Sequence, residues 1–271
     1  MPHQDLGEVS IYYEKTDFTR AGERDRPSLL FVHGLNSSHR HWLNQVPVFA
    51  RRHAVITVDL RGHGQSSAPP EGYSVHHHTD DLAGLLDALE VGEVVVIGAS
   101  LGGCMAQQLA VRIPQRVKAI VAVGSCAQTP KELDLNALLP AVEQMGIENF
   151  LREFLPGATF CSDVAPGLVE FALDIALKSK PEIILQRTKE GLVYDGVETA
   201  RKIDCPALIL MGENDNTTPR YCSEELKELI KGSEFGVIPG CGHLPHLEAP
   251  EVFNEILSRF LDRQPWKSAG A

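Results

Sequence analysis

A serine set among small residues is the first group in this chain that could carry out chemistry. The run GASLG at residues 98–102 follows the apolar residues 94–97 and precedes a stretch with helical spacing. In a strand–turn–helix context of this kind, G-x-S-x-G forms a nucleophile elbow, which holds the serine hydroxyl at the carboxyl end of a sheet. An ordinary Gly/Ser-rich turn is the alternative, but the motifs that follow favour Ser100 as a nucleophile.

Two later motifs supply the partners that a nucleophilic serine needs, because its hydroxyl reacts only when a base removes the proton. The run GEND at 212–215 follows the apolar residues 207–211, and GCGH at 240–243 lies in a Gly-rich loop further on. We expect His243 to act as the base, since an imidazole both takes and gives a proton near neutral pH. We expect Asp215 to hold the imidazole tautomer and to stabilise the imidazolium.

Neighbouring residues leave alternatives open for these roles. Glu213 could replace Asp215 as the acidic partner, because it lies two residues earlier and nearer the end of the strand. His246 could replace His243 as the base, although its place before the terminal helix suits an exposed or helix-capping role better. Cys241 lies two residues before His243 and is a weaker candidate nucleophile than a serine in an elbow.

Short apolar runs rich in β-forming residues alternate along the chain with amphipathic helical stretches. The predicted strands are residues 28–32, 54–58, 94–97, 117–123, 207–211 and 234–238. The predicted helices between and after them include 79–90, 101–113 and 249–261. Continuous apolar strands separated by helices indicate an α/β fold, with a mostly parallel central sheet and helices on both faces.

This alternation breaks between residues 128 and 200. The segment contains helical patterns, such as 138–145 and 168–177, but no convincing buried strand. It is longer than an ordinary connection built around one helix, which is the alternative interpretation. We therefore predict a core domain of residues 1–127 and 201–271 with an inserted helical cap at 128–200.

The order of these motifs resembles that of the α/β-hydrolase superfamily, and the resemblance covers nearly all of the chain. Two further motifs contribute to it: HGL at 33–35 and DLRGHGQS at 59–66, each of which follows a predicted strand. The elbow at 98–102, the acid motif at 212–215 and the histidine motif at 240–243 then follow in the order that this superfamily uses. The resemblance implies the α/β-hydrolase fold.

The same resemblance implies the site and its activity. It assigns a catalytic triad of Ser100, Asp215 and His243, and an oxyanion hole made by the backbone N–H groups of Leu35 and Leu101. The chain is similar to bacterial carboxylesterases and enol-lactone hydrolases. The expected function is a serine hydrolase that cleaves a small carboxylic ester or lactone through an acyl-enzyme on Ser100. Relatives that open epoxides or displace halide use an aspartate at the elbow, so a serine excludes that chemistry.

Two other functions stay open. A C–C bond hydrolase of ring-fission products would share the triad, but those relatives usually carry a tryptophan after the catalytic histidine, where this chain has Leu244. Their oxyanion loop is also often longer and richer in glycine than the loop at 34–38. A ligand receptor or signalling protein with a hydrolase fold is the second alternative, and it would need a protein partner recruited only when ligand is present.

Several polar residues near the motifs have structural interpretations. We expect His33 to brace the oxyanion loop through hydrogen bonds, and Arg61 and His63 to hold their own loop. The consecutive histidines 76–78 point in different directions and do not converge on a metal, so we expect a solvated helix start. No G-x-G-x-x-G motif is present to bind a dinucleotide. We expect neither a metal nor an organic cofactor.

The sequence indicates less about the substrate pocket than about any other part of the site. We expect its lining to be mainly apolar. Candidate lining residues, each equally suited to core packing, are Phe150, Phe154, Leu155, Phe160 and Trp42. A carboxylate on the substrate could be met by either of two arginines, Arg152 or Arg187.

Composition bounds the partners and the compartment. The 271 residues carry a formal net charge of −11 without a basic cluster, which argues against nucleic acid and anionic membrane surfaces as partners. No apolar run approaches the ~18 residues of a membrane span, and the N-terminus lacks the pattern of a signal peptide. Six scattered cysteines without a C-x-x-C pair indicate reduced thiols. We expect a cytoplasmic enzyme with a small-molecule substrate. The sequence does not indicate the oligomeric state.

Overall fold

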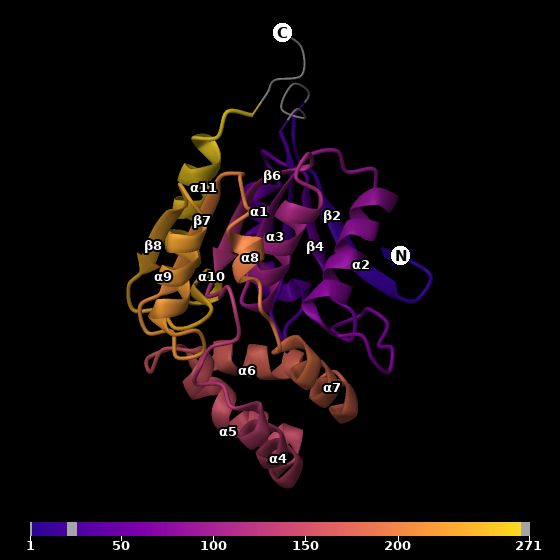
Figure 1. Ribbon diagram of the computed structural model, residues 1–271, viewed down its shortest axis with the longest axis vertical. Helices are drawn as coiled ribbons and strands as arrows, with labels where there is room; N and C mark the ends of the chain where they lie inside the picture. The colour runs from indigo at the N-terminus through magenta and orange to yellow at the C-terminus, as the bar shows by residue number, and fades with distance from the viewer. Residues whose placement is uncertain (1, 21–25, 267–271) are drawn as a thin grey trace.

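A mostly parallel β-sheet runs through the centre of the molecule (Figure 1). In the computed structural model, which describes residues 2–20 and 26–266, eight strands pair in the order β1-β2-β4-β3-β5-β6-β7-β8. They are β1 (His3–Asp5), β2 (Ser10–Thr16), β3 (Ser28–Val32), β4 (Val55–Val58), β5 (Val94–Ala99), β6 (Val117–Val123), β7 (Ala207–Gly212) and β8 (Glu234–Ile238). The pairs β4-β3, β3-β5, β5-β6, β6-β7 and β7-β8 are parallel. The pairs β1-β2 and β2-β4 are antiparallel. The predicted α/β fold and its parallel sheet are confirmed.

Helices cover both faces of the sheet, because successive strand side chains point to opposite sides. Leu30, Val96 and Ile120 face α2 (Val75–Ala88), α3 (Leu101–Arg112) and α9 (Arg220–Leu229). The alternate strand residues, among them Leu29 and Val95, face the elements of the other side, namely η1 (His39–Trp42), α1 (Val46–Phe49) and α11 (Pro250–Asp262). The two apolar layers fix the sheet, and with it the loops that carry the motifs.

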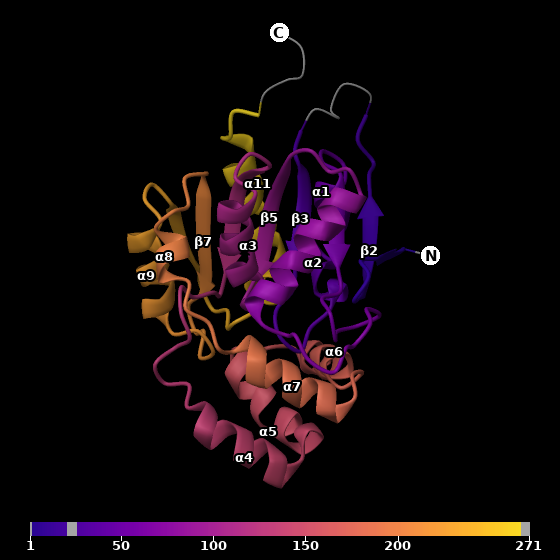
Figure 2. The same ribbon diagram turned by 45° about the vertical axis from the view of Figure 1, so that its right-hand side comes forward.

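The chain between β6 and β7 is helical, as expected. It forms α4 (Leu135–Met145), α5 (Ile147–Thr159), α6 (Pro166–Ala176), α7 (Pro181–Gly191) and α8 (Val197–Ala200). Figures 1 and 2 show α4–α7, called the cap helices below, gathered beyond one end of the strands. Helices α5, α6 and α7 share a small apolar cluster of their own, whereas Tyr194 and Ala200 pack with the core under α3. A separate cap domain at 128–200 stays a prediction.

The start of α2 differs from the expected one. The helix begins at Val75 rather than near residue 79, because the Ser74 hydroxyl accepts a hydrogen bond from the backbone N–H of His77 and caps it. His76 and His77 are exposed, but His78 is fully buried, so a solvated start holds for only two of the three histidines. Among the described residues, no cluster of three or more side chains suits a metal ion, and no helix is long and apolar enough to cross a membrane.

Three backbone segments meet closely where β5 turns into α3. A β-carbon on Gly102 would lie 2.7 Å from the carbonyl oxygen of His33 and even closer to that of Val32. A β-carbon on Gly98 would meet the backbone of Gly102 itself. Glycine is therefore required at both ends of the elbow by the packing of strand against helix.

Replacing Gly102 with alanine should destabilise the fold. The new methyl group would press on backbone oxygens that cannot move aside, and overpacking of this kind costs about 1–3 kcal/mol of unfolding free energy. Urea unfolding of Gly102→Ala measures the effect. Gly92→Ala is the matched control, because nothing lies within 4 Å of its added methyl group. Equal stability of the two variants would contradict the close approach.

The core contains an unusual number of histidines that burial keeps neutral. Burial lowers the pKa of His33 and His53 to about 4 and that of His246 to about 3. Burial also holds the pKa values of three further side chains well below the ordinary value, namely those of His41, His63 and His78. In each case the folded chain binds a proton less readily than the unfolded chain.

This difference makes the fold sensitive to mild acid. Because the folded pKa values lie below the unfolded value of 6.5, the stabilisation is complete above pH 6.5 and is lost as the pH falls toward 4. Each such histidine contributes a slope of about 1.4 kcal/mol per pH unit in that window. Urea unfolding should give a free energy of unfolding that is several kcal/mol lower at pH 5.5 than at pH 7.5. In His78→Phe, the slope of the unfolding free energy against pH should be smaller by the contribution of one histidine. A free energy of unfolding that does not change with pH would contradict the assignment of these histidines as neutral.

Candidate active site

Ser100 occupies the turn between β5 and α3 in a strained backbone conformation. Its φ is +53° and its ψ is −120°, a region that residues with a β-carbon rarely adopt. The backbone N–H of Ser100 donates to the Val123 carbonyl at 2.7 Å, and the Ser100 carbonyl accepts from Gly103 at 2.9 Å. These bonds to a neighbouring strand and to the helix hold the strained turn, as functional sites often require. The elbow geometry predicted from the sequence is present.

His243 and Asp215 form a buried pair. The Nδ1 atom of His243 lies 3.0 Å from Oδ1 and 2.9 Å from Oδ2 of Asp215. With its Nδ1–H donated to the carboxylate, the imidazole presents Nε2 as a free base. The side chains of His243 and Asp215 are 6% and 0% exposed, so little water competes for this bond.

The Asp215 carboxylate is held in its ionised form by its neighbours. It accepts hydrogen bonds from the backbone N–H groups of Thr217 and Thr218 at 2.9 Å each, and from the Thr218 hydroxyl at 2.8 Å. Burial alone would raise the pKa of Asp215, but the His243 charge and these bonds outweigh it and lower the pKa. A carboxylate that stays charged is what an imidazolium partner requires.

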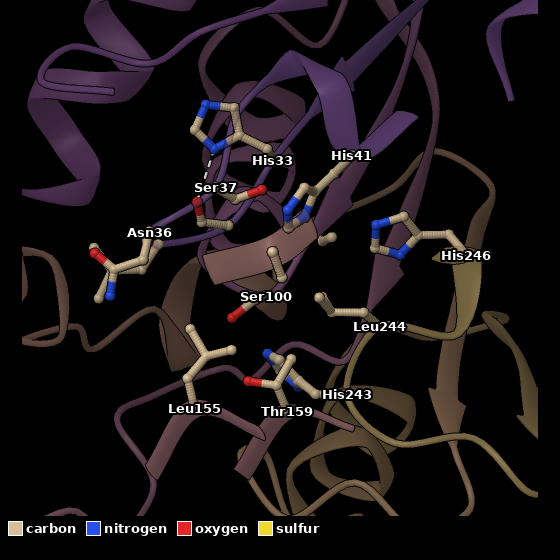
Figure 3. Close-up of a pocket in the computed structure, with 14 residues that line it drawn as sticks. His33, Asn36, Ser37, His41, Ser100, Leu155, Thr159, His243, Leu244 and His246 are labelled. Atoms are coloured by element: carbon tan, nitrogen blue, oxygen red, sulfur yellow. Dashed lines mark hydrogen bonds between the residues drawn. The ribbon is translucent and has the colours of Figure 1, made fainter. Parts of the chain in front are cut away.

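Ser100 and His243 line the same cavity, to which the cap helices contribute Leu155 and Thr159 (Figure 3). The backbone N–H of His243 donates to the Thr159 carbonyl at 2.7 Å, and Thr159 is the last residue of α5. The cap helices therefore position the loop that carries His243, and they also form one wall of the cavity.

The alternative partners are engaged elsewhere. Glu213 is exposed, and its carboxylate accepts a hydrogen bond from the backbone N–H of Gly240 at 3.0 Å, so it holds the loop rather than His243. His246 is fully buried and stacks on Trp42 with ring centroids 4.3 Å apart. The expectation of an exposed or capping His246 is wrong, because α10 (Pro245–Glu248) turns it into the core. Cys241 is also buried, within the apolar layer under α11.

The loop after β3 passes directly beside the elbow. A β-carbon on Gly34 would lie 2.9 Å from Cβ of Ser100, so this residue must be glycine for the loop to come so close. His33 braces the loop as expected: its Nδ1 lies 2.7 Å from the Gly34 carbonyl, and its Nε2 accepts the backbone N–H of Leu60 at 3.0 Å. The backbone of Leu35 thereby comes near Ser100.

Leu101 supplies the second predicted oxyanion donor. It is the first residue of α3, where backbone N–H groups have no acceptor within the helix and the helix dipole favours negative charge. Leu35 and Leu101 both line the larger cavity beside Ser100. Their roles as oxyanion donors stay a prediction.

Two cavities open at Ser100. The larger, of about 320 Å³, is walled mainly by apolar side chains, including Phe150, Phe154 and Leu155 of the cap helices. The smaller, of about 50 Å³, lies toward the loop after β3. Of the expected lining residues, Phe160 and Trp42 border neither cavity, because both are packed in apolar clusters of the core.

The two arginines expected to meet a substrate carboxylate do not line either cavity. Arg152 is exposed on α5 and pairs with Glu148 at 3.1 Å. Arg187 is buried, and burial lowers its pKa to about 9. Its guanidinium donates to the Asn36 side chain at 2.8 and 3.2 Å and to the Gly62 carbonyl, which ties α7 to the loops after β3 and β4.

The predicted roles of Arg61 and His63 in their own loop are confirmed. Arg61 forms a two-bond ion pair with buried Asp81 at 2.6 and 2.7 Å, and Nδ1 of His63 lies 2.9 Å from the Arg61 carbonyl. Arg61 also donates to the Gly72 carbonyl at 2.9 Å, so these contacts hold the loop after β4 together and tie it to α2.

Comparison with known sequences decides the family. The sequence model of the Alpha/beta hydrolase family matches residues 29–256, which is most of the chain. The chain belongs to the alpha/beta hydrolase family. Its fold, its elbow and the His243–Asp215 pair agree with that membership.

Individual relatives of this alpha/beta hydrolase are distant but nearly full-length. It is 27% identical to 3-oxoadipate enol-lactonase 2 of Acinetobacter baylyi, over 91% of this chain and 93% of the relative. Est816, described as an N-acyl homoserine lactone degrading enzyme, is 28% identical with a TM-score of 0.85, over 96% of this chain and all of that one. A thermophilic esterase from Thermogutta terrifontis is 26% identical with a TM-score of 0.81, over 96% of each chain.

Sequence reasoning missed several residues that hold this hydrolase site together. Thr218 follows the acid motif, and a polar residue three positions after Asp215 was an available signal. Thr159 had none, because its partner lies far away in the sequence. Arg187 was expected to meet a substrate carboxylate, and its actual partner, Asn36, is equally distant in the sequence. Cys104 and Cys126 also border the larger cavity.

The acid that serves His243 can be identified without knowing the substrate. A fluorophosphonate labels an activated serine, and its rate of reaction with Ser100 reports how well His243 acts as a base. Asp215→Asn should slow labelling by about 10³-fold or more, because the amide supports the wrong tautomer. Glu213→Gln is the matched control and should leave the rate within a factor of a few. The reverse pattern would assign the role to Glu213.

Proposed function

We propose that this protein is a serine hydrolase that cleaves a small carboxylic ester or lactone through an acyl-enzyme on Ser100. The observation that carries the proposal is the buried contact between His243 and Asp215, at 2.9 to 3.0 Å, beside a serine in an elbow with positive φ. A nucleophile, a base and an orienting acid on three different loops is the arrangement that acyl transfer requires.

In the first half of the proposed reaction, the Ser100 hydroxyl oxygen attacks the carbonyl carbon while Nε2 of His243 takes its proton. The backbone N–H groups of Leu35 and Leu101 stabilise the negative oxygen of the tetrahedral intermediate, and one such donor contributes about 2.7–4 kcal/mol. The intermediate then collapses to an acyl-enzyme. His243 returns the proton to the leaving alkoxide.

In the second half, water replaces the alcohol. His243 takes a proton from the water, whose oxygen attacks the acyl carbon, and the acid leaves as Ser100 regains its proton. Asp215 stays ionised throughout and stabilises the imidazolium that forms in each half. In a lactone, the alkoxide stays attached to the acyl group, so a single hydroxy acid is released.

The larger cavity supports an uncharged substrate. Among the described residues that line it there is no lysine, arginine, aspartate or glutamate, and most of its wall is apolar. Burying an unpaired carboxylate there would be costly, so neutral acyl and alcohol groups fit best. The relatives described as an enol-lactonase, a lactone-degrading enzyme and an esterase support the same bond type.

Other aspects of the assignment stay predictions. Neither nucleic acid nor a membrane is expected as a partner, and the oligomeric state is open. A cytoplasmic location is supported by the six free cysteines, since none is paired in the structure.

Hydrolysis of p-nitrophenyl esters from acetate to octanoate tests the proposal. We expect saturable turnover with an optimum at a medium chain length, set by the size of the larger cavity. Ser100→Ala should reduce kcat by about 10³-fold or more, because the covalent step needs the hydroxyl. A p-nitrophenyl ester that ends in a carboxylate should react about tenfold or more slowly than its uncharged analogue.

The controls separate the alternatives. Full activity in a folded Ser100→Ala variant would rule out the acyl-enzyme. Labelling of Ser100 by a fluorophosphonate without turnover of any ester or lactone would favour the ligand receptor. Faster cleavage of a ring-fission dienone than of any ester would favour the C–C hydrolase.

A further inference from the structure

Three buried polar side chains surround the smaller cavity beside Ser100. Ser37 lies in the loop after β3, His41 in η1 and His246 in α10, and the three are 5%, 4% and 0% exposed. Figure 3 shows Ser37 and His41 on the opposite side of Ser100 from His243 and Thr159. The catalytic steps proposed above use none of the three.

Polar atoms of these side chains lack hydrogen-bond partners within the part of the chain that the structure describes. They are the Ser37 hydroxyl oxygen, Nε2 of His41 and both ring nitrogens of His246. Buried polar groups are nearly always paired, so each such atom calls for an explanation. Their gathering around one cavity at the nucleophile points to a polar group that enters the cavity.

The charge of the cavity limits what that group can be. Burial holds the pKa of His41 well below its ordinary value and lowers that of His246 to about 3, so both rings are neutral. In the part of the chain that the structure describes, no lysine, arginine, aspartate or glutamate lines this cavity. A carboxylate or an ammonium group would find no counter-charge here. A hydroxyl or carbonyl group can pair with a neutral imidazole and with a serine hydroxyl.

The size of the cavity sets the second limit. Its volume of about 50 Å³ exceeds the roughly 10–15 Å³ that one water needs, and it is far below the 320 Å³ of the apolar cavity. It therefore has room for a substituent of a few heavy atoms. Ala172 and Leu244 supply apolar wall between the polar side chains.

We propose that the smaller cavity is a polar subsite for a hydroxyl or carbonyl group on the smaller of the two substituents of a neutral ester or lactone. Ser37 and His41 make the hydrogen bonds, and His246, whose ring centroid lies 6.4 Å from that of His41, lines the same cavity. The larger, apolar substituent occupies the 320 Å³ cavity. This inference rests on the proposed function, because it specifies the substrate class of the same site.

Pairs of esters that differ by a single hydroxyl test the subsite. One pair, 1-naphthyl butyrate and 1-naphthyl 3-hydroxybutyrate, places the hydroxyl on a small acyl group. The other, propyl octanoate and 3-hydroxypropyl octanoate, places it on a small alcohol. We expect the hydroxylated member to have a kcat/KM about three- to tenfold higher in at least one pair, which is the usual worth of one or two added hydrogen bonds.

Variants attribute this preference to the subsite. Ser37→Ala and His41→Phe should each bring the ratio within a pair close to one, mainly by slowing the hydroxylated ester. Ser223→Ala and His78→Phe are the matched controls, because each removes an equally buried, unpartnered polar group that borders neither cavity. Both controls should keep the wild-type ratio. Ser37→Ala removes a single atom, so the test does not depend on the folding of His41→Phe.

The outcomes separate this inference from the proposed function. Turnover of both members at equal kcat/KM in the wild type would mean that the cavity holds only water, and would overturn the subsite while the hydrolase stands. A preference that survives in both Ser37→Ala and His41→Phe would also overturn it. Absence of turnover for all four esters, while p-nitrophenyl esters or a lactone are hydrolysed, would overturn the subsite and leave the hydrolase standing. Absence of turnover for every ester and lactone, with Ser100 still labelled by a fluorophosphonate, would overturn both.

Discussion

The close meeting of three backbone segments at Ser100 is the constraint on which the rest of the site depends. The loop after β3, the end of β5 and the first turn of α3 approach so closely that β-carbons are excluded at Gly34, Gly98 and Gly102. Ser100 adopts a positive φ in this packing, and its side chain lines both cavities. It directly precedes α3, whose first N–H groups have no acceptor within the helix. The strain is local, and the apolar layers on both faces of the sheet hold it.

The electrostatics of the site follow from burial. Most of the buried histidines are kept neutral by their low-dielectric surroundings, whereas His243 stands beside a carboxylate that is itself held ionised by three hydrogen bonds. An ionised carboxylate that is shielded from water can strongly stabilise an imidazolium that develops beside it. The described residues that line both cavities include no lysine, arginine, aspartate or glutamate, and we expect this to limit the substrates of the proposed hydrolase.

The cap helices are part of the site rather than a cover placed over it. The end of α5 accepts the backbone N–H of His243, and Arg187 on α7 binds Asn36, which directly follows Leu35. Asn36 itself has a φ of +57°, so this contact stabilises an uncommon backbone conformation next to a predicted oxyanion donor. A shift of the cap helices would therefore disturb the base and the oxyanion loop together. In the proposed mechanism, these few hydrogen bonds couple the shape of the larger cavity to the position of His243 and of the loop after β3.

The sequence by itself determined the features that depend on neighbouring residues. Apolar runs and helical spacing gave the strands and helices of the core, although not the antiparallel strands β1 and β2, which lack a continuous apolar run. Small residues around Ser100, and motifs at the ends of successive parallel strands, indicated which side chains would meet, because parallel strands bring their carboxyl ends to one edge.

Only the tertiary structure decided which side chains are buried and what they face. The burial of His78 and His246, the inward turn of Arg187 and the exclusion of Trp42 from the cavities all depend on segments far away in the chain. The unpartnered groups of Ser37 and His41 become visible only when η1, α6 and α10 are brought around one small cavity. A local pattern specifies the turn that a residue makes, but the environment of its side chain is set by packing between distant elements.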